Sequence, residues 1–570
     1  MIDTSDVVVV GAGPSGLASA LQLGKAGVRV RLLERRRTPS DQPRAHVLNA
    51  RTMELFRSWG VADDVREDGL APELATSFGV LTELSGEEFG RLDIDEDATA
   101  LYSTERLCNC PQDRIEARLL AAVRALPTVS VEFGHEVTDI DVSEDDVTVG
   151  ARDTQGRTSS MSARFLIAAD GAGSWLRDLT GIEMPRATPL GRRLNIYFHA
   201  DLTSQVRSRP FILWFIHNVA TQGIFISLDG RTRWVYSVEM SAGESADDYP
   251  ATRCRALLRA ALGVPDIEPD IRSTLTWTVG MGVADQLRNG PVFLVGDAAH
   301  TFPPAGGMGM NSGIQDAHNL AWKLTAVLNG QAGEKLLDTY EAERRPVAVH
   351  NATQSMVNAR RQQEAARAMA SPDFLALLAS PEGGGLRAAV ASGLHDLHEE
   401  FQSLGQQFGY VYRSDALVDD GSPRRDSTVT QYNVTARPGA RAPHVLLRDA
   451  HGDSWSSVQL FDGHWSLAFA GPAAKWAEDV EDAARVPVRT FGVHGLEPTG
   501  GLRADDYLGL MGPEALAELY ELRIGDAERP GGAVLVRPDG HVAARWQDGP
   551  QDVTDVVRVM DAVLARASTA

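Results

Sequence analysis

The chain has 570 residues, 43% of them hydrophobic, which is enough to bury more than one core and predicts about three domains. Its formal net charge of −22 argues against a nucleic-acid partner, because the phosphate backbone would repel so acidic a surface. The chain has only three cysteines, which argues against a disulfide framework and a metal site. No apolar run reaches membrane-spanning length and no signal peptide is seen, which argues against a membrane anchor. Together these features predict a cytoplasmic protein.

The first expected elements are a buried strand, a glycine-rich turn and a helix. Residues 6–10 (DVVVV) are almost wholly apolar and β-branched, as in a strand of a parallel sheet. The turn that follows contains Gly11, Gly13, Ser15 and Gly16. Glycines at this spacing allow a tight turn, close approach of a pyrophosphate, and close packing of helix on strand. A second strand over 28–33 ends in Glu34, whose carboxylate would bind ribose hydroxyls, so we predict a bound dinucleotide.

The stretch 186–286 departs from this pattern. Its alternating runs predict antiparallel strands over 194–200, 211–217, 223–228 and 233–240. A sheet inserted into a nucleotide-binding domain would cover a substrate. Side chains on these runs are candidate substrate contacts, although aromatics on alternating strands are often core residues: Trp214, His217, Phe225, Trp234, Tyr236 and Met240.

A second cofactor-binding segment is expected over 294–324. It reads as a strand ending in Gly296 and Asp297, a Pro/Gly-rich loop, and a helix. The first turn of a helix presents free N–H groups and the positive end of the dipole, which suits an electron-rich ring. The residues that would shape this loop and first turn are Pro304, Gly307, Met308, Gly309, Met310 and Asn311.

A polar linker is predicted over 401–443 and a last domain over 444–570. The expected elements are strands over 466–470 and 488–493, helices over 473–484 and 553–567, and a hairpin turning at 538–540. This order indicates a thioredoxin-like fold. The domain has no cysteine, and thioredoxin redox chemistry needs a dithiol pair, so we expect a structural or assembly role. Such a domain could serve the interface of a homo-oligomer.

Four motifs carry a resemblance to a known family: GAGPSG at 11–16, PRAH at 43–46, DGAGS at 170–174 and GDAAH at 296–300. Their order and spacing resemble the FAD-dependent aromatic hydroxylases, class A flavoprotein monooxygenases of the para-hydroxybenzoate hydroxylase type. The chain looks closest to the phenol hydroxylase branch typified by 2,4-dichlorophenol 6-monooxygenase. The resemblance covers nearly the whole chain, including the C-terminal part.

The resemblance implies an α/β fold in three parts. A Rossmann-like FAD-binding domain of the glutathione-reductase type would comprise 1–185 and 287–400, with the antiparallel-sheet substrate domain of 186–286 inserted between its halves. The thioredoxin-like domain would follow at 444–570.

The same resemblance implies which residues contact FAD. Arg44 would bind the pyrophosphate, unless it is merely a solvated surface arginine. Asp297 would bind the ribityl hydroxyls, unless it only caps a helix. Gln112 would contact the linker of the flavin. Weaker candidates for the adenosine portion are Arg35 and, through its backbone, Val137. The N–H groups of Met310 and Asn311 would face the pyrimidine edge of the isoalloxazine and stabilise negative charge on the reduced ring.

His46 is the candidate catalytic residue. In the resembling phenol hydroxylases, the residue two after the motif arginine lies near the isoalloxazine on the substrate side. An imidazole can accept a phenolic proton near neutral pH, and a phenolate ring is the better nucleophile. The alternative is a histidine that only hydrogen-bonds the flavin or the backbone. Asn109 stands where the family pattern leads us to expect an aspartate.

The implied reaction is hydroxylation of a phenol or a hydroxylated heteroaromatic ring through a flavin C4a-hydroperoxide. It would consume O2 and either NADPH or NADH, since no second nucleotide-binding fingerprint distinguishes the two. The methionine-rich loop over 303–311 would tolerate a larger, more apolar ring system, which favours a secondary-metabolite intermediate. Two alternatives stay open: an oxidative decarboxylase on the same fold, and a non-catalytic carrier that binds FAD and a ligand.

Overall fold

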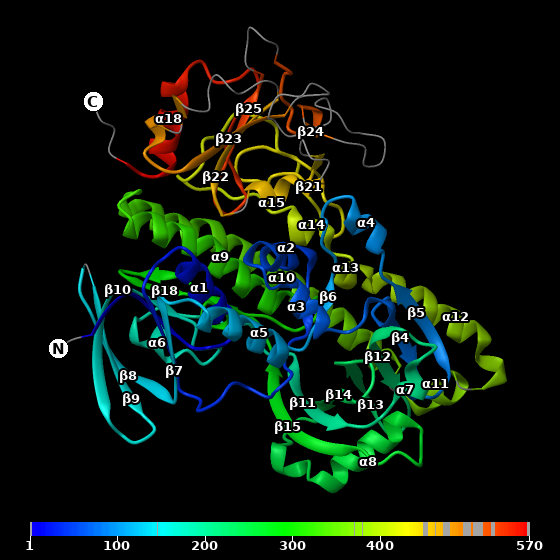
Figure 1. Ribbon diagram of the computed structural model, residues 1–570. Coiled ribbons are helices and arrows are strands. Elements are labelled where there is room, and N and C mark those ends of the chain that lie inside the picture. The colour runs from blue at the N-terminus through cyan, green and yellow to red at the C-terminus, as the bar shows by residue number, and fades with distance from the viewer. Residues whose placement is uncertain are drawn as a thin grey trace.

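The protein is seen in a computed structural model, whose main layers Figure 1 shows. The structure describes residues 3–144, 146–369, 371–378, 380–448, 454–461, 463–470, 479–480, 482–493, 503–504, 517–525 and 531–566. Two long helices, α9 (Met308–Leu328) and α10 (Thr339–Ala368), run across the middle of the molecule. The C-terminal sheet lies on one side of them, and the two larger sheets lie on the other (Figure 1).

The first sheet has the strand order β17-β18-β10-β1-β2-β7 and is the predicted nucleotide-binding sheet. Its centre is parallel, because β1 pairs in parallel with both β2 and β10. Val7, Val8 and Val9 are fully buried, as their apolar run predicted. The strands are β1 (Asp3–Val10), β2 (Val30–Glu34), β7 (Val129–Phe133), β8 (His135–Val142), β9 (Val147–Asp153), β10 (Thr158–Ala168), β17 (Arg288–Asn289) and β18 (Val292–Leu294).

Helices and short strands complete this unit. The helix α1 follows the first glycine turn and packs against both α5 and α9. The elements are α1 (Pro14–Lys25), β3 (Val47–Leu48), α2 (Ala50–Trp59), α3 (Ala62–Glu67), α4 (Glu96–Ala100), β6 (Cys108–Asn109), α5 (Gln112–Arg124), α6 (Trp175–Leu179), β16 (Gly282–Val283) and β19 (His300–Thr301). The chain therefore presents the end of β1 and the start of α1 beside the N-terminus of α9.

The second sheet has the order β15-β11-β14-β13-β12-β4-β5. Its antiparallel part is the sheet predicted for 186–286, but β4 and β5 come from residues 77–93, which the sequence analysis placed with the first half of the FAD domain. They extend the edge because β4 pairs in parallel with β12, a long-range contact that no local pattern announces. The elements are β4 (Ser77–Leu81), β5 (Glu88–Asp93), β11 (Gly191–His199), α7 (Thr203–Val206), β12 (Phe211–His217), β13 (Gln222–Ser227), β14 (Arg233–Met240), α8 (Ala251–Leu262) and β15 (Asp270–Val279).

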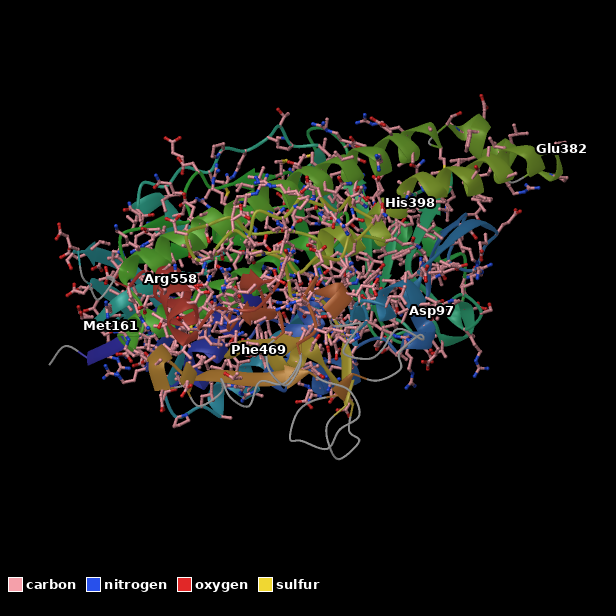
Figure 2. All side chains as sticks on the ribbon, turned by 90° about the horizontal axis from the view of Figure 1, so that it is seen from above. Asp97, Met161, Glu382, His398, Phe469 and Arg558 are labelled. Carbon is pink, nitrogen blue, oxygen red and sulfur yellow. The ribbon has the colours of Figure 1, made fainter. Side chains whose placement is uncertain are left out.

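Short helices continue beyond α10 and reach β4 and β5. Figure 2 shows Glu382 at one end of the molecule, in the helical segment that also leads to His398, and Met161 at the opposite end. These helices are α11 (Pro372–Leu378), α12 (Gly384–Gly393), α13 (His398–Phe401) and α14 (Leu404–Phe408). Among the described helices, none is both long enough and apolar enough to cross a membrane.

The C-terminal domain contains a sheet with the order β23-β22-β25-β26. The strand β22 is parallel to β23 and antiparallel to β25, as the predicted thioredoxin-like order requires. The predicted helix over 473–484 lies mostly outside the described residues. The described elements are β20 (Leu446–Arg448), β21 (Ser454–Ser456), α15 (Ser457–Phe461), β22 (Trp465–Ala470), β23 (Val488–Val493), β24 (Arg503–Ala504), β25 (Ala533–Val536), β26 (Val542–Trp546) and α18 (Val553–Val563).

Buried charges join this domain to the central helices. Arg537 donates to both carboxylate oxygens of Glu343 in α10, at 2.6 and 2.9 Å, and Lys323 in α9 donates to the same carboxylate at 2.8 Å. All three side chains are fully buried. The segment 401–443, predicted to be a polar linker, also packs closely, since Tyr412 is buried. The C-terminal domain is thus docked on α9 and α10, which both contribute residues to the wall of the cavity described next.

Candidate functional site

A cavity of about 1780 Å³ lies between the first two sheets and the N-terminus of α9. Small-molecule sites commonly measure about 300–1,000 Å³, so this one has room for a dinucleotide and a second molecule. Of the predicted cofactor-binding residues, Gly16 is outside the cavity wall and the others line it: Gly11, Gly13, Ser15, Glu34, Arg35, Arg44, Gln112, Val137, Asp297, Pro304, Gly307, Met308, Gly309, Met310 and Asn311. His46 lines the same cavity.

The three glycines of the first turn have different surroundings. Gly11 has a φ of 107°, and a Cβ there would lie 2.3 Å from the carbonyl oxygen of Ala169. A Cβ on Gly16 would lie 1.9 Å from the carbonyl oxygen of Gly11, so this position serves helix–strand packing. A Cβ on Gly13 would meet nothing within 4 Å. The open surface at Gly13, at the uncapped N-terminus of α1, suits an anionic pyrophosphate.

Glu34 is held as an anion at the end of β2. Its Oε2 accepts from the backbone N–H of Ala12 at 2.8 Å, and its Oε1 accepts from the backbone N–H of Arg36 at 2.8 Å and from its Nε at 3.1 Å. Burial alone would raise the pKa of Glu34, but these bonds outweigh it and hold that pKa below its usual value. Arg36, the middle residue of the Arg35–Arg37 run, is therefore the arginine that contacts Glu34. Arg35 lines the cavity, and its predicted contact with the adenosine portion stays a prediction.

A second carboxyl on the cavity wall lacks a full set of partners. Gln112 Nε2 donates to Glu116 Oε1 at 2.7 Å, and Gln112 Oε1 accepts from the N–H of Ala45 at 3.3 Å. Glu116 Oε2 is buried with no hydrogen-bond partner among the described residues, although Arg36 Nη1 lies 3.8 Å away. Burial raises the pKa of Glu116. A ligand hydroxyl would satisfy this carboxyl, so the wall fits a sugar-bearing cofactor.

The N-terminus of α9 opens onto the cavity. Gly307 occupies the N-cap with a φ of 63° and caps the helix without a side chain. Its own N–H donates to the carbonyl oxygen of Pro304 at 2.9 Å. The next three N–H groups, those of Met308, Gly309 and Met310, have no partner within a helix. Together with the helix dipole, they can stabilise negative charge on a bound ring.

Asn311 ties the start of α9 to the strand β3. Its Nδ2 donates to the carbonyl oxygens of Val47 at 2.9 Å and Gly307 at 2.7 Å, and its Oδ1 accepts from the N–H of Asn49 at 3.0 Å. The Asn311 side chain thus fixes the segment that follows His46. The contact predicted for its backbone N–H stays a prediction.

Asp297 lies just after β18 and is exposed towards the cavity. The surrounding protein raises its pKa through burial, while the nearby charges of His300 and Arg44 act in the opposite direction. Behind it, Asp316 accepts from Arg344 Nε at 2.8 Å and lies 2.6 Å from His300 Nε2. This buried network fixes the turn that presents Asp297.

His46 forms a short hydrogen bond through Nδ1 with Asn109 Oδ1. Asn109 Nδ2 donates to the carbonyl oxygen of Ser227 at 3.3 Å, which leaves Oδ1 as the acceptor. His46 Nδ1 therefore carries the proton, and Nε2 keeps its lone pair. Burial lowers the pKa of His46, and the hydrogen bond that His46 donates to Asn109 only partly offsets this, so the imidazole is neutral at neutral pH. Such a group can act as a base.

The second sheet turns one of its faces to the cavity, and most of the predicted substrate residues lie on the other. Successive strand residues point to opposite faces, and the face covered by α8 forms a core with Cys254 and Leu258 of that helix. Five predicted residues are in this core and outside the cavity wall: Trp214, Phe225, Trp234, Tyr236 and Met240. The bulky aromatics, which the predicted set favoured, fill the gap between sheet and helix.

His217 is the predicted substrate residue that does line the cavity. Its companions on that face were not predicted as substrate contacts. They are Asn195, Tyr197, Leu213, Phe215, Ile224, Ile226, Val235, Ser237, Leu275 and Trp277. Trp277 Nε1 donates to Asn195 Oδ1 at 3.0 Å. Knowing that α8 covers the other face would have identified this set by parity alone.

Two family models match the chain. The model described as an FAD binding domain matches residues 4–355, and the model described as the C-terminal domain of aromatic-ring hydroxylases matches residues 435–567. Among curated proteins, aklavinone 12-hydroxylase DnrF of Streptomyces peucetius is 35% identical over 485 residues, which cover 83% of this chain and 92% of that protein. The 2,4-dichlorophenol 6-monooxygenase of Delftia acidovorans is 32% identical, with 96% of each chain covered.

Solved structures resemble the whole chain. The flavin-dependent monooxygenase PieE, in complex with FAD and substrate, matches with a TM-score of 0.88 and 32% identity over 99% of both chains. RebC, a rebeccamycin biosynthetic enzyme with bound 7-carboxy-K252c, matches with a TM-score of 0.82 and 31% identity over the full length of both chains.

Proposed function

Because the chain belongs to the FAD-dependent aromatic-ring hydroxylases, we propose that it inserts one atom of O2 into the ring of a phenol or hydroxylated heteroaromatic, with NADPH or NADH as the electron source. Bound FAD supplies the electrons that activate oxygen. The protein binds and orients both molecules, removes a proton from the substrate and excludes water.

The residues around the cavity fit FAD from one end to the other. Glu34 suits the ribose hydroxyls of the adenosine, and the open turn at Gly13 suits the pyrophosphate. Asp297 suits the ribityl hydroxyls. The N-terminus of α9, which has no side-chain cap, suits the edge of the isoalloxazine that becomes negative on reduction. Arg44 lines the cavity and adds positive charge on the same side as Gln112.

The observation that carries the proposal is the neutral imidazole of His46, held with Nε2 as a hydrogen-bond acceptor in the wall of this cavity. Removing the proton of a phenol makes the ring carbons more nucleophilic, which oxygen insertion requires. Nε2 of His46 would take that proton, and Nδ1 would stay bonded to Asn109 throughout. Nearby apolar side chains, such as those of Phe78 and Ile212, keep water from the reacting atoms.

The substrate we favour is a polycyclic phenol of secondary metabolism. The cavity is large, and its sheet face is mainly apolar. Among the relatives, one is named for aklavinone, whereas another is named for a chlorinated phenol. Cavity size favours the larger class, since a monocyclic phenol would leave much of the wall uncovered.

The test is the consumption of NADPH and NADH by the purified holoenzyme with monocyclic phenols, hydroxypyridines and polycyclic phenols, with product masses measured in parallel. We expect oxidation of the nicotinamide to accelerate with one class, together with a product that has gained one oxygen atom. His46→Ala should keep its FAD but lower hydroxylation and raise peroxide release. Unchanged coupling between NAD(P)H consumption and hydroxylation in this variant would remove His46 from the mechanism.

Oxidative decarboxylation is the second candidate. It is favoured by the likeness to RebC, whose structure holds a carboxylated compound. The same assay separates the two outcomes, because a decarboxylated product has lost carbon dioxide from the substrate skeleton.

A further inference from the structure

On β12 and β13, the cavity face of the second sheet is apolar between two histidines. At one end, Asn109 contacts both His46 and the carbonyl oxygen of Ser227, the last residue of β13. At the other end, Gln222 begins β13 and pairs with His217 on β12. The side chains between them that face the cavity are Leu213, Phe215, Ile224 and Ile226. A flat apolar ring system would cover this wall without leaving polar groups unpaired.

Among the described residues, His217 is a polar group without a hydrogen-bond partner. The residue is 6% exposed, and its Nδ1 is buried with no hydrogen-bond partner in the described part of the chain. Burial lowers the pKa of His217 to about 4, so the ring is neutral at neutral pH. A buried polar side chain normally finds a hydrogen bond, because leaving it unpaired costs free energy. No described residue hydrogen-bonds either nitrogen of the His217 ring, so we expect a ligand in the cavity to supply a partner to the nitrogen that the cavity can reach.

The enclosed nitrogen decides which atom meets that ligand. An unpaired N–H donor is rarely buried, so Nδ1 is best left as the unprotonated nitrogen, and Nε2 then carries the proton. Since Nδ1 is enclosed by protein, Nε2 is the nitrogen left to face the cavity that His217 lines. His217 would thus donate a hydrogen bond to an oxygen atom of the ligand.

The distance along β13 from the end near His46 to the end near His217 sets the length of the ligand. Ser227 and Gln222 are five residues apart on β13, which corresponds to about 17 Å at about 3.4 Å per residue. A single phenol ring cannot reach both His46 and His217. A linear system of three or more fused rings, with an oxygen substituent at each end, can do so.

We propose that His217 binds, through Nε2–H, an oxygen substituent on the ring farthest from the one that is hydroxylated, so that the site selects polycyclic substrates with oxygens at both ends. This inference rests on the proposed function, because it takes His46 as the end where the reaction occurs. His217 is a specificity-determining residue in this view and takes no part in proton transfer.

The experiment compares three probes in the holoenzyme: 2,6-dihydroxyanthraquinone, 2-hydroxyanthraquinone and phenol. Dissociation constants come from the change in flavin absorbance, and kcat and KM come from NAD(P)H oxidation. The variants are His217→Leu, which cannot donate, and His217→Gln, which keeps an N–H donor. His350→Gln, at an exposed histidine of α10, is the matched control. FAD content and thermal melting are checked for each variant.

We expect the wild type to bind 2,6-dihydroxyanthraquinone most tightly. His217→Leu should weaken this binding about tenfold while leaving 2-hydroxyanthraquinone unaffected, and His217→Gln should restore part of the loss. KM should rise in parallel, with kcat little changed. His350→Gln should match the wild type.

The inference is overturned if the wild type binds the two anthraquinones equally or binds neither, or if His217→Leu weakens both by the same factor. The protein could instead discriminate the anthraquinones through His217 while none of the three aromatic probes stimulates NAD(P)H oxidation. That result would contradict the proposed function and leave the binding inference standing. Turnover of phenol alone would support the hydroxylase and overturn the polycyclic selection.

Discussion

Replacing Gly13 with alanine separates cofactor binding from folding at the first turn. The backbone of Gly13 has φ −80° and ψ 179°, which alanine adopts without strain, and the new Cβ would meet nothing within 4 Å. Folding of the apoprotein should therefore be unharmed. Alanine restricts the unfolded chain more than glycine does but is the poorer residue at the N-cap of α1, so these opposing effects should leave the free energy of unfolding within about 1 kcal/mol of the wild type.

FAD binding should nevertheless weaken in this variant. The open space at Gly13 is where we place the pyrophosphate, and a methyl group there would hold it away from the N-terminus of α1. We expect the dissociation constant of FAD to rise at least about tenfold, which corresponds to about 1.4 kcal/mol. The matched control is Gly16→Ala, whose Cβ would lie 1.9 Å from the carbonyl oxygen of Gly11. Overpacking of this kind costs about 1–3 kcal/mol or more, so the control should lose stability even without FAD.

The assay has two parts: urea denaturation of the apoprotein, and titration of the apoprotein with FAD followed by quenching of flavin fluorescence. The expected pattern is a stable Gly13→Ala apoprotein with weak FAD binding, and a destabilised Gly16→Ala apoprotein. Wild-type affinity for FAD in Gly13→Ala would refute the placement of the pyrophosphate. A loss of apoprotein stability in the same variant as large as that of Gly16→Ala would refute the argument from open space.

Three further predictions concern buried polar groups. Asn109→Asp places a carboxylate against His46 and raises the pKa of His46, so the acidic limb of the pH profile of kcat/KM should move to higher pH. An acidic limb that does not move would show that His46 is not the titrating base. Glu343→Gln leaves buried cations without their carboxylate and should lower the free energy of unfolding by about 3–5 kcal/mol, whereas the exposed control Glu334→Gln should cost less than about 1 kcal/mol in the same denaturation series. Burial raises the pKa of Glu400 to about 8, whereas a glutamate in an unfolded chain has a pKa of about 4.3. Between these two pH values, the folded state therefore keeps a proton on Glu400 that the unfolded state has lost. The resulting contribution to the free energy of unfolding is present at low pH and is lost as the pH rises towards 8. Glu400→Gln should therefore reduce the decline of the urea midpoint with pH across that range. An unchanged decline would show that it comes from other groups.

The motifs of the sequence were sufficient for the family and for the general fold. The run before Gly11, the glycine spacing and Glu34 are local features, since one strand, one turn and one helix arrange them with little help from the rest of the chain. The same holds for the loop and helix around Met308 and for the order of elements along the chain in the C-terminal domain. The predicted family and fold class are confirmed for these reasons.

The tertiary structure decided which side chains face the cavity. Strand periodicity separates Trp214 from Phe215 onto opposite faces, but only the packing of α8 determines which face is core and which is open. The addition of β4 beside β12 and the bond between His46 and Asn109 join segments far apart in the chain. Long-range contacts of this kind depend on how whole layers pack against one another, and the local spacing of residue types carries no record of that packing.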